Sequence, residues 1–229
     1  MRKYRSNASS VVRFEYGVEL VEGLQQFPET TSASTGFEKT NNDLFAQYQT
    51  RMSLRTPILH ARVKIRLTQR KVDQALRSAA HGAEIADGGR RGRIFGVAFP
   101  MGLKPVVSPV GRGQVKPTVE WIERLEKSQL EGIDAYRDEW LPKIKSALAT
   151  LNAAIAAHEQ STAAYNDAFK SELAVREAHH DAVDKIIGLV RAAFPRDREI
   201  QDVIFPQMDD DDSVEVEEPP APEKVQTPA

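Results

Sequence analysis

The longest hydrophobic pattern of the chain lies between Lys143 and Phe194, in a stretch with no proline and a single glycine, Gly188. Apolar residues recur along it in steps of four and three, the spacing of one face of a helix that packs along a seam. At 1.5 Å per residue such a helix would be about 80 Å long, too long to be buried inside a compact domain of this size. We therefore expect it to lie against other long helices. The seam residues are Ile144, Leu148, Leu151, Ile155, Tyr165, Phe169 and Leu173.

A second helix is expected from about residue 57 to 86. Thr56-Pro57 places a capping residue before proline, at the position in a first turn that proline favours. Residues 63–67 also alternate between apolar and basic, which would suit a strand, but the length of the pattern favours a helix. Further helical segments are expected from about Phe37 to Arg55 and after Pro117, with a kink or a new start at Pro142.

Two segments leave the local structure open. Residues 12–20 alternate apolar and polar, which favours a strand, but the same residues also allow a short helix. Residues 88–116 are rich in glycine and proline and contain two short apolar runs, a pattern typical of an irregular β-hairpin or a long ordered loop that joins two helices.

These patterns predict a mainly α fold, an elongated antiparallel helical bundle resembling a coiled coil, with a small β-hairpin or irregular loop element at one end. We expect residues 1–10 to be a disordered N-terminus and residues 11–208 to be a single elongated domain that carries 88–116 as a hairpin insertion. Residues 209–229, rich in Asp, Glu and Pro, are expected to be an acidic disordered tail.

The composition of the chain excludes several kinds of site and segment. The chain has no cysteine, which excludes disulfides and thiolate metal sites, and its mean hydropathy is -0.45. The N-terminus lacks the apolar run of a secretory signal, and no window is apolar for long enough to span a membrane. We therefore expect a soluble, cytoplasmic protein that does not engage a membrane. Glu177 and His180 have the spacing of half a carboxylate–histidine metal site, but no second Glu-x-x-His exists, so we predict no metal and no cofactor.

Charge is unevenly distributed, although the net charge is -2. Residues 51–116 hold 14 bases and three acids, a local charge of +11, whereas eight acids and one base follow Met208. The basic residues form a candidate anion-binding stripe and a Gly-rich loop that could contact phosphates. The alternative is internal pairing with the acids between Glu120 and Glu139. The candidate anion-binding residues are Arg51, Arg55, Arg62, Arg66, Arg70, Arg77, Arg90, Arg91 and Arg93.

The two apolar runs of the insertion are a candidate docking surface if they are exposed, and the end cap of the bundle if they are buried. The candidate partner-docking residues are Ile94, Phe95, Val97, Phe99, Val106 and Val107.

No catalytic motif is present, so the sequence predicts a non-enzymatic structural or scaffolding protein that acts through helix–helix association. Its partner would be another protein or a second copy of the chain in a homo-oligomer. The alternative is a nucleic-acid or polyanion-binding protein that uses the arginine-rich helix face and is modulated by the acidic C-terminal tail.

Overall fold

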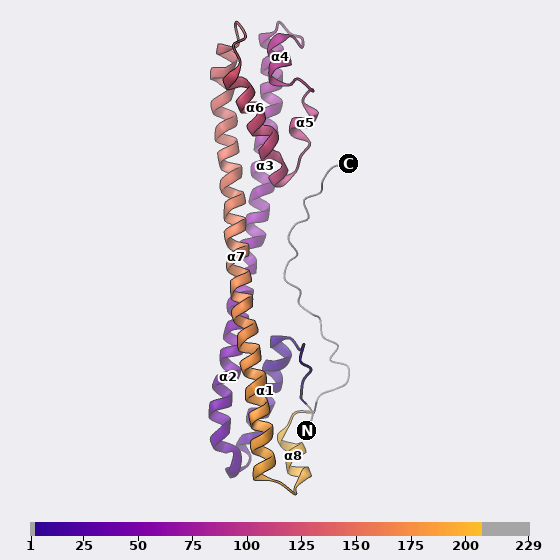
Figure 1. The fold of residues 1–229 in the computed structure, drawn as a ribbon, viewed down its shortest axis with the longest axis vertical. Helices are drawn as coiled ribbons and strands as arrows, with labels where there is room; N and C mark the ends of the chain where they lie inside the picture. Colours follow the sequence, from indigo (N-terminus) through magenta and orange to yellow (C-terminus); the bar gives the residue numbers. More distant parts are fainter. Residues whose placement is uncertain (1–2, 208–229) are drawn as a thin grey trace. The chain divides into compact units, whose positions relative to one another are not determined.

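The computed structural model describes residues 3–207, and this part of the chain is mainly helical, with no strand in it (Figure 1). The predicted mainly α fold is confirmed, and the β-hairpin, one of the two forms expected for residues 88–116, is not present in these residues. The helices are α1 (Ser10–Gln25), α2 (Pro28–Ser53), α3 (Arg55–Ala86), α4 (Arg93–Ala98), α5 (Lys104–Val107), the 3-10 helix η1 (Gly111–Gln114), α6 (Val115–Lys127), α7 (Asp134–Ala193) and α8 (Arg198–Ile204).

The described residues fall into two compact units, although the sequence indicates one domain over 11–208. Unit 1 combines residues 3–55 with 163–207, and unit 2 comprises residues 56–162. The predicted acidic tail, 209–229, lies outside the described residues. Each unit has a hydrophobic core of its own.

Residues 12–20, for which the sequence allows either a strand or a helix, are part of helix α1. The Ser9 side chain caps it by accepting a hydrogen bond from the Val12 backbone N–H at 3.3 Å. Apolar residues at helical spacing, Tyr16 and Leu20, face the core, whereas Val18, which a strand would have placed with them, is 45% exposed. A helix forms here because helical spacing, unlike alternation, keeps the buried residues on one face over three turns of α1.

Unit 1 packs α1, α2, α8 and the C-terminal part of α7 around one core (Figure 1). Phe27 contacts Phe194, whereas Arg51 contacts Tyr165, so α2 and α7 run antiparallel. Residues 3–9, expected to be disordered, contain a turn and contact α7, where Lys3 pairs with Asp184 and Tyr4 is buried. Their contacts are with residues far along the chain, which local sequence patterns do not reveal.

Unit 2 packs α3, α6 and the first part of α7 around a core that includes Trp121. The Tyr136 hydroxyl of α7 donates a hydrogen bond to the Ala79 carbonyl of α3 at 2.9 Å. Helix α7 continues through Pro142, so the new start, one of the two possibilities expected there, does not occur. Pro142 and Asp138, whose carbonyl the proline leaves without a helical donor, are both exposed, so water can bond to that carbonyl.

The glycine- and proline-rich segment folds into short helices instead of a hairpin. Asp87, just after α3, accepts hydrogen bonds from the backbone N–H groups of Gly92, Ile94 and Phe95 at 2.9–3.1 Å. Burial acts to raise the pKa of Asp87, but these three N–H groups outweigh it and hold the pKa below its usual value. The carboxylate therefore starts α4, which turns the apolar run 94–99 inward at helical spacing.

Candidate functional site

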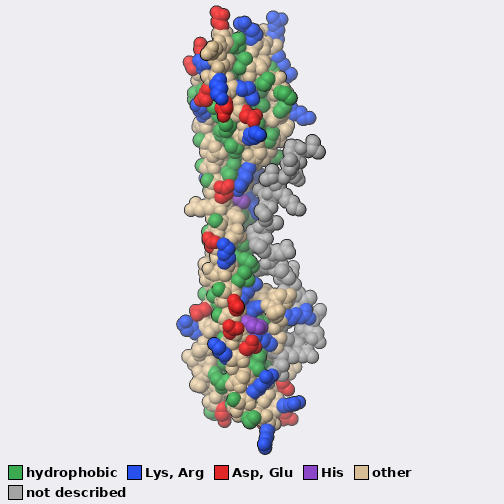
Figure 2. Space-filling view, in the orientation of Figure 1, with side chains coloured by type: hydrophobic (Ala, Val, Ile, Leu, Met, Phe, Trp, Pro, Cys, Tyr) green, Lys and Arg blue, Asp and Glu red, His purple; other side chains and the backbone are tan. Residues whose placement is uncertain are grey.

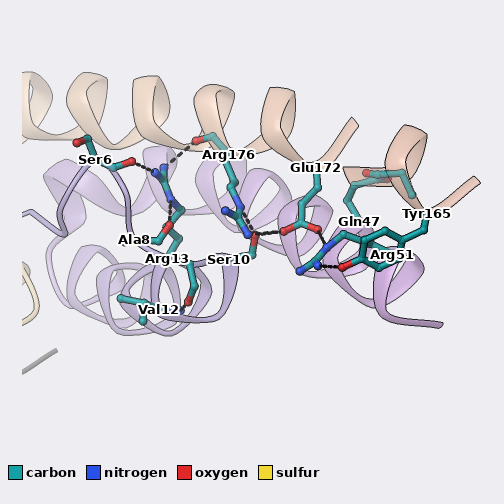
Figure 3. Close-up of polar contacts among 12 residues, drawn as sticks. Ser6, Ala8, Ser10, Val12, Arg13, Gln47, Arg51, Tyr165, Glu172 and Arg176 are labelled. Atoms are coloured by element: carbon teal, nitrogen blue, oxygen red, sulfur yellow. Dashed lines mark hydrogen bonds and ion pairs between the residues drawn. The ribbon is translucent and has the colours of Figure 1, made fainter. Parts of the chain in front are cut away.

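A buried polar cluster joins three helices of unit 1 (Figure 3). Glu172 of α7 is fully buried and accepts hydrogen bonds from Ser10 at 2.5 Å and from Arg176 at 2.6 Å, and it also bonds Arg51. Arg51 in turn donates to the Tyr165 hydroxyl at 2.5 Å. One carboxylate thus lies between two guanidinium groups, and hydrogen bonds hold both of its oxygens.

Arg13 fixes the N-terminal segment beside this cluster. Its guanidinium donates to the carbonyl oxygens of Ser6 at 2.6 Å, Ala8 at 3.0 Å and Arg176 at 2.9 Å. It also lies over the Tyr4 ring, 4.8 Å from its centroid. Arg13 is 5% exposed, so three backbone carbonyls satisfy the hydrogen-bond donors of a buried cation.

A second chain of hydrogen bonds continues from Tyr4. Its hydroxyl is 2.8 Å from His179 Nδ1, and His179 Nε2 is 3.1 Å from Asn41 Oδ1. Burial, followed by the charge of Arg13, lowers the pKa of His179 to about 4, so its ring is neutral at pH 7. Asn41 donates from Nδ2 to the Phe14 carbonyl, so its oxygen faces His179, Nε2 carries the proton, and Tyr4 donates to Nδ1.

These groups form a structural network. The central side chains are bonded to one another and buried, which leaves no exposed group aimed at a ligand. Within residues 3–207, no three His, Asp or Glu side chains are arranged to hold a metal ion. His179, the neighbour of the Glu177/His180 pair considered for a metal, is committed to Tyr4 and Asn41.

The structure separates the predicted anion-binding arginines. Arg51 belongs to the buried cluster of unit 1 and is 1% exposed, so it is not part of a surface stripe. Arg55 is exposed at the first residue of α3. Arg91 pairs with Glu84 at 3.0 Å, while the remaining loop arginines, Arg90 and Arg93, are exposed. The exposed arginines along α3 in unit 2 are Arg62, Arg66, Arg70 and Arg77.

The α3 arginines do not pair with the acids of α6, the alternative that the sequence raised. In the described part of the chain, Glu123 pairs with Lys127 at 3.1 Å and Glu126 pairs with Lys145 at 2.5 Å. Figure 2 shows acidic and basic side chains intermixed at the end of unit 2 that carries α4 and α6. No ion pair among residues 3–207 involves the three consecutive arginines of the stripe, Arg62, Arg66 and Arg70.

An apolar ridge accompanies these arginines. Leu59, Val63 and Leu67 are 48%, 44% and 58% exposed, and they follow one another at steps of four residues on α3. The opposite face of the helix, including Val72 and Leu76, is buried in the core of unit 2. We call the exposed side, made of the ridge and the basic residues beside it, the α3 outer face. It combines an apolar ridge with cations that lack a partner in the described residues.

The predicted docking residues are part of the core of unit 2. Ile94, Phe95, Phe99 and Val106 are at most 7% exposed. Val97 and Val107 are partly buried and pack against the same core. The insertion therefore caps this core, as expected if the two apolar runs are buried. These side chains form no exposed docking surface.

The buried polar cluster was missed at the sequence level, although a signal was present. Steps of four and three from Tyr165 through Phe169 lead to Glu172, Arg176 and His179, not to Leu173, which is 45% exposed. A charged residue at a seam position of a helix indicates a buried polar pair. The partners Ser10, Arg13 and Tyr4 carry no such signal.

Comparison of the chain with known protein families, with curated proteins and with solved structures finds no match. No helix within residues 3–207 has both the length and the apolar character needed to cross a bilayer.

Proposed function

We propose that this protein acts without catalysis, as a structural or scaffolding protein that works through helix–helix association. The observation that carries the proposal is the α3 outer face, where Leu59, Val63 and Leu67 form an exposed ridge at helical spacing. Ridges of this kind are what a second helix packs against. On the opposite face of α3, Ile58, Ala61 and Thr68 are buried, so the helix is packed on one face and presents this ridge on the other.

Three finer predictions accompany the proposal: an elongated antiparallel bundle, a homo-oligomer as one form of the association, and a cytoplasmic location. Light scattering after gel filtration measures the mass of the particle, and small-angle scattering measures its length. A mass equal to that of one chain would argue against a homo-oligomer and favour a different protein as the partner.

A displayed library of amphipathic helices tests the proposal directly. Its members share an apolar ridge and differ in the charges beside that ridge. We expect helical sequences to be enriched on the full chain and to lose binding to the double variant Leu59→Gln/Leu67→Gln. The proposal fails if no helix is enriched and the chain also remains monomeric, with circular dichroism confirming that the variant is folded.

A second function, binding of nucleic acid or another polyanion, is favoured by one observation. Arg62, Arg66 and Arg70 have no ion-pair partner in the described residues, so their charges are free to face phosphates. This function predicts duplex DNA binding that weakens steeply with salt and strengthens when residues 209–229 are deleted. Absence of binding by the shortened chain at low salt would eliminate it.

A further inference from the structure

We infer that the α3 outer face binds an amphipathic helix of another protein, one whose apolar ridge is flanked by acidic side chains. The inference rests on the proposed function and adds the chemistry of the partner. Two features of the described residues carry it, the geometry of the apolar ridge and the distribution of charge on both sides of it.

The ridge has the dimensions of a short helix–helix contact. Leu59 and Val63, and Val63 and Leu67, are each four residues apart, so the three side chains follow one row along the helix. At 1.5 Å per residue the row spans about 12 Å, or roughly two turns. A facing helix would meet it with apolar residues spaced by three and four, the pattern used when helices dock in apolar grooves.

Basic residues lie on both sides of the ridge. With 3.6 residues per turn, Arg62, Arg66 and Arg70 fall along one side, and Lys64 and Lys71 fall along the other. All five side chains are exposed. These are the places where flanking charges select the partner of a coiled-coil helix.

The acids that α3 itself carries along this face are too few to neutralise it. Between Arg55 and His81 the chain has seven lysines or arginines and a single acid, Asp73. Asp73 is partly buried, and burial raises its pKa, opposed by the charge of Arg77. The α3 outer face therefore keeps a positive field that attracts a helix with glutamate or aspartate beside its ridge and repels one with basic flanks.

The same features argue against other occupants. A second copy of the α3 outer face would bring basic flanks against basic flanks. Nucleic acid would use the arginines but would gain little from Leu59 and Leu67, which lie beside them. A lipid surface is poorly matched, because residues 59–85 contain no Phe, Tyr or Trp to enter the interface.

Three fluorescent peptides test the inference by polarisation on the full chain. Each is a stapled 21-residue helix with one leucine ridge, flanked by Glu in the first, Gln in the second and Lys in the third. We expect the Glu-flanked helix to bind at least about tenfold tighter than the Gln-flanked helix at low salt, and the Lys-flanked helix to bind weakest. Raising the salt should narrow these differences.

Matched variants distinguish the contribution of charge to binding from the contribution of the apolar ridge. Arg66→Glu/Arg70→Glu should weaken the Glu-flanked helix by tenfold or more, whereas Lys185→Glu/Arg191→Glu, on α7 of unit 1, carries the same change of charge and should leave binding unchanged. Leu59→Gln/Leu67→Gln should weaken the Glu-flanked and Gln-flanked helices alike. Circular dichroism confirms that each variant is folded.

The outcomes distinguish this inference from the proposed function. Equal binding of the Glu-flanked and Gln-flanked helices overturns the acidic partner but leaves helix association standing. If no helix binds, whether among the three peptides or from the library, both the acidic partner and the proposed helix association are overturned. If duplex DNA or phosphatidylserine vesicles bind in a way that needs Arg66 and Arg70 but not Leu59 and Leu67, the face is a polyanion surface and the inference is wrong.

Discussion

Arg51 of α2 and Glu172 of α7 form an ion pair in which the arginine side chain is 2% exposed and the glutamate is fully buried. Removing two charges from water is costly, and their attraction offsets this only when further hydrogen bonds hold them. Here Ser10 and Arg176 complete the coordination of the carboxylate. The pair therefore fixes α1, α2 and α7 to one another at a single register.

Replacing Glu172 by glutamine should destabilise unit 1 strongly. The change keeps the shape of the side chain but leaves the buried guanidiniums of Arg51 and Arg176 without their anion, a loss of about 3–5 kcal/mol in the free energy of unfolding. Hydrogen exchange of the α7 amides around this site measures the loss. Glu177→Gln, at an exposed position of the same helix, is the matched control. Equal protection in the two variants would show that the pair contributes little.

Acid should destabilise unit 1 through His179. Burial, then the charges of Arg13, Lys3 and His180, lowers its pKa from 6.5 to about 4. Between these two values the unfolded chain binds more protons than the folded one, so the free energy of unfolding falls as the pH drops from 6.5 toward 4. The loss contributed by His179 is at most about 3 kcal/mol.

Denaturation as a function of pH checks this expectation in two variants. His179→Gln should flatten the dependence between pH 6.5 and 4, although its stability at pH 7 will be lower because the bonds to Tyr4 and Asn41 change. His81→Gln, a substitution at an exposed histidine of unit 2, should leave the dependence intact. An unchanged slope in the His179 variant would mean that other groups cause the acid sensitivity.

Gly17 and Gly36 should respond in opposite ways to alanine. A Cβ at Gly17 would lie 2.1 Å from Asn41 Oδ1, so the methyl group displaces the amide that bonds His179. We expect Gly17→Ala to cost about 1–3 kcal/mol. Gly36, on α2, has no atom within 4 Å of such a Cβ, so Gly36→Ala should stabilise by about 0.5–1 kcal/mol through helix propensity. Thermal unfolding of both variants measures the contrast.

Asp87→Ala should loosen α4 while leaving α3 intact. The carboxylate accepts three backbone N–H bonds at the start of α4, and capping residues of this kind contribute about 1 kcal/mol. Amide exchange of Ile94 and Phe95 should accelerate, with Asp138→Ala, at an exposed position of α7, as the control. Unchanged exchange at these two amides would show that packing against the core of unit 2 is enough to hold α4.

The helical character of the chain was predictable because period and length are local properties. The apolar pattern predicts the seam of α7 as far as Phe169 and is wrong at Leu173, because the residue that continues the four-three spacing is the charged Glu172. Glu172 occupies that seam position because Arg51 and Ser10, from two other helices, compensate its charge. Residue type alone does not show that compensation.

The strands expected in the insertion and the place of Arg51 in the arginine stripe were wrong for a related reason. The apolar runs 94–99 and 106–110 are typical of strands. Asp87 starts a helix at the first run by accepting three backbone hydrogen bonds, which the residue pattern does not predict. Arg51 and Arg62 carry the same charge at similar helical spacing, yet one is buried against Glu172 and the other is exposed. Only the packing of α2 and α3 against different parts of the chain separates them.

The division of the chain into units implies an order of synthesis and folding. Among the described residues, unit 2 is one continuous segment, 56–162, whereas unit 1 needs residues 3–55 together with 163–207. On the ribosome, the early residues that carry Arg13 and Arg51 must therefore wait for Glu172 and Arg176 to emerge. That interval lasts about 5–30 seconds at roughly 5–20 residues per second, and unit 2, which ends at residue 162, is complete only near its end. Residues 3–55 are thus made well before the residues of unit 1 that they contact, and it is then that nascent α1 and α2 most need protection by chaperones.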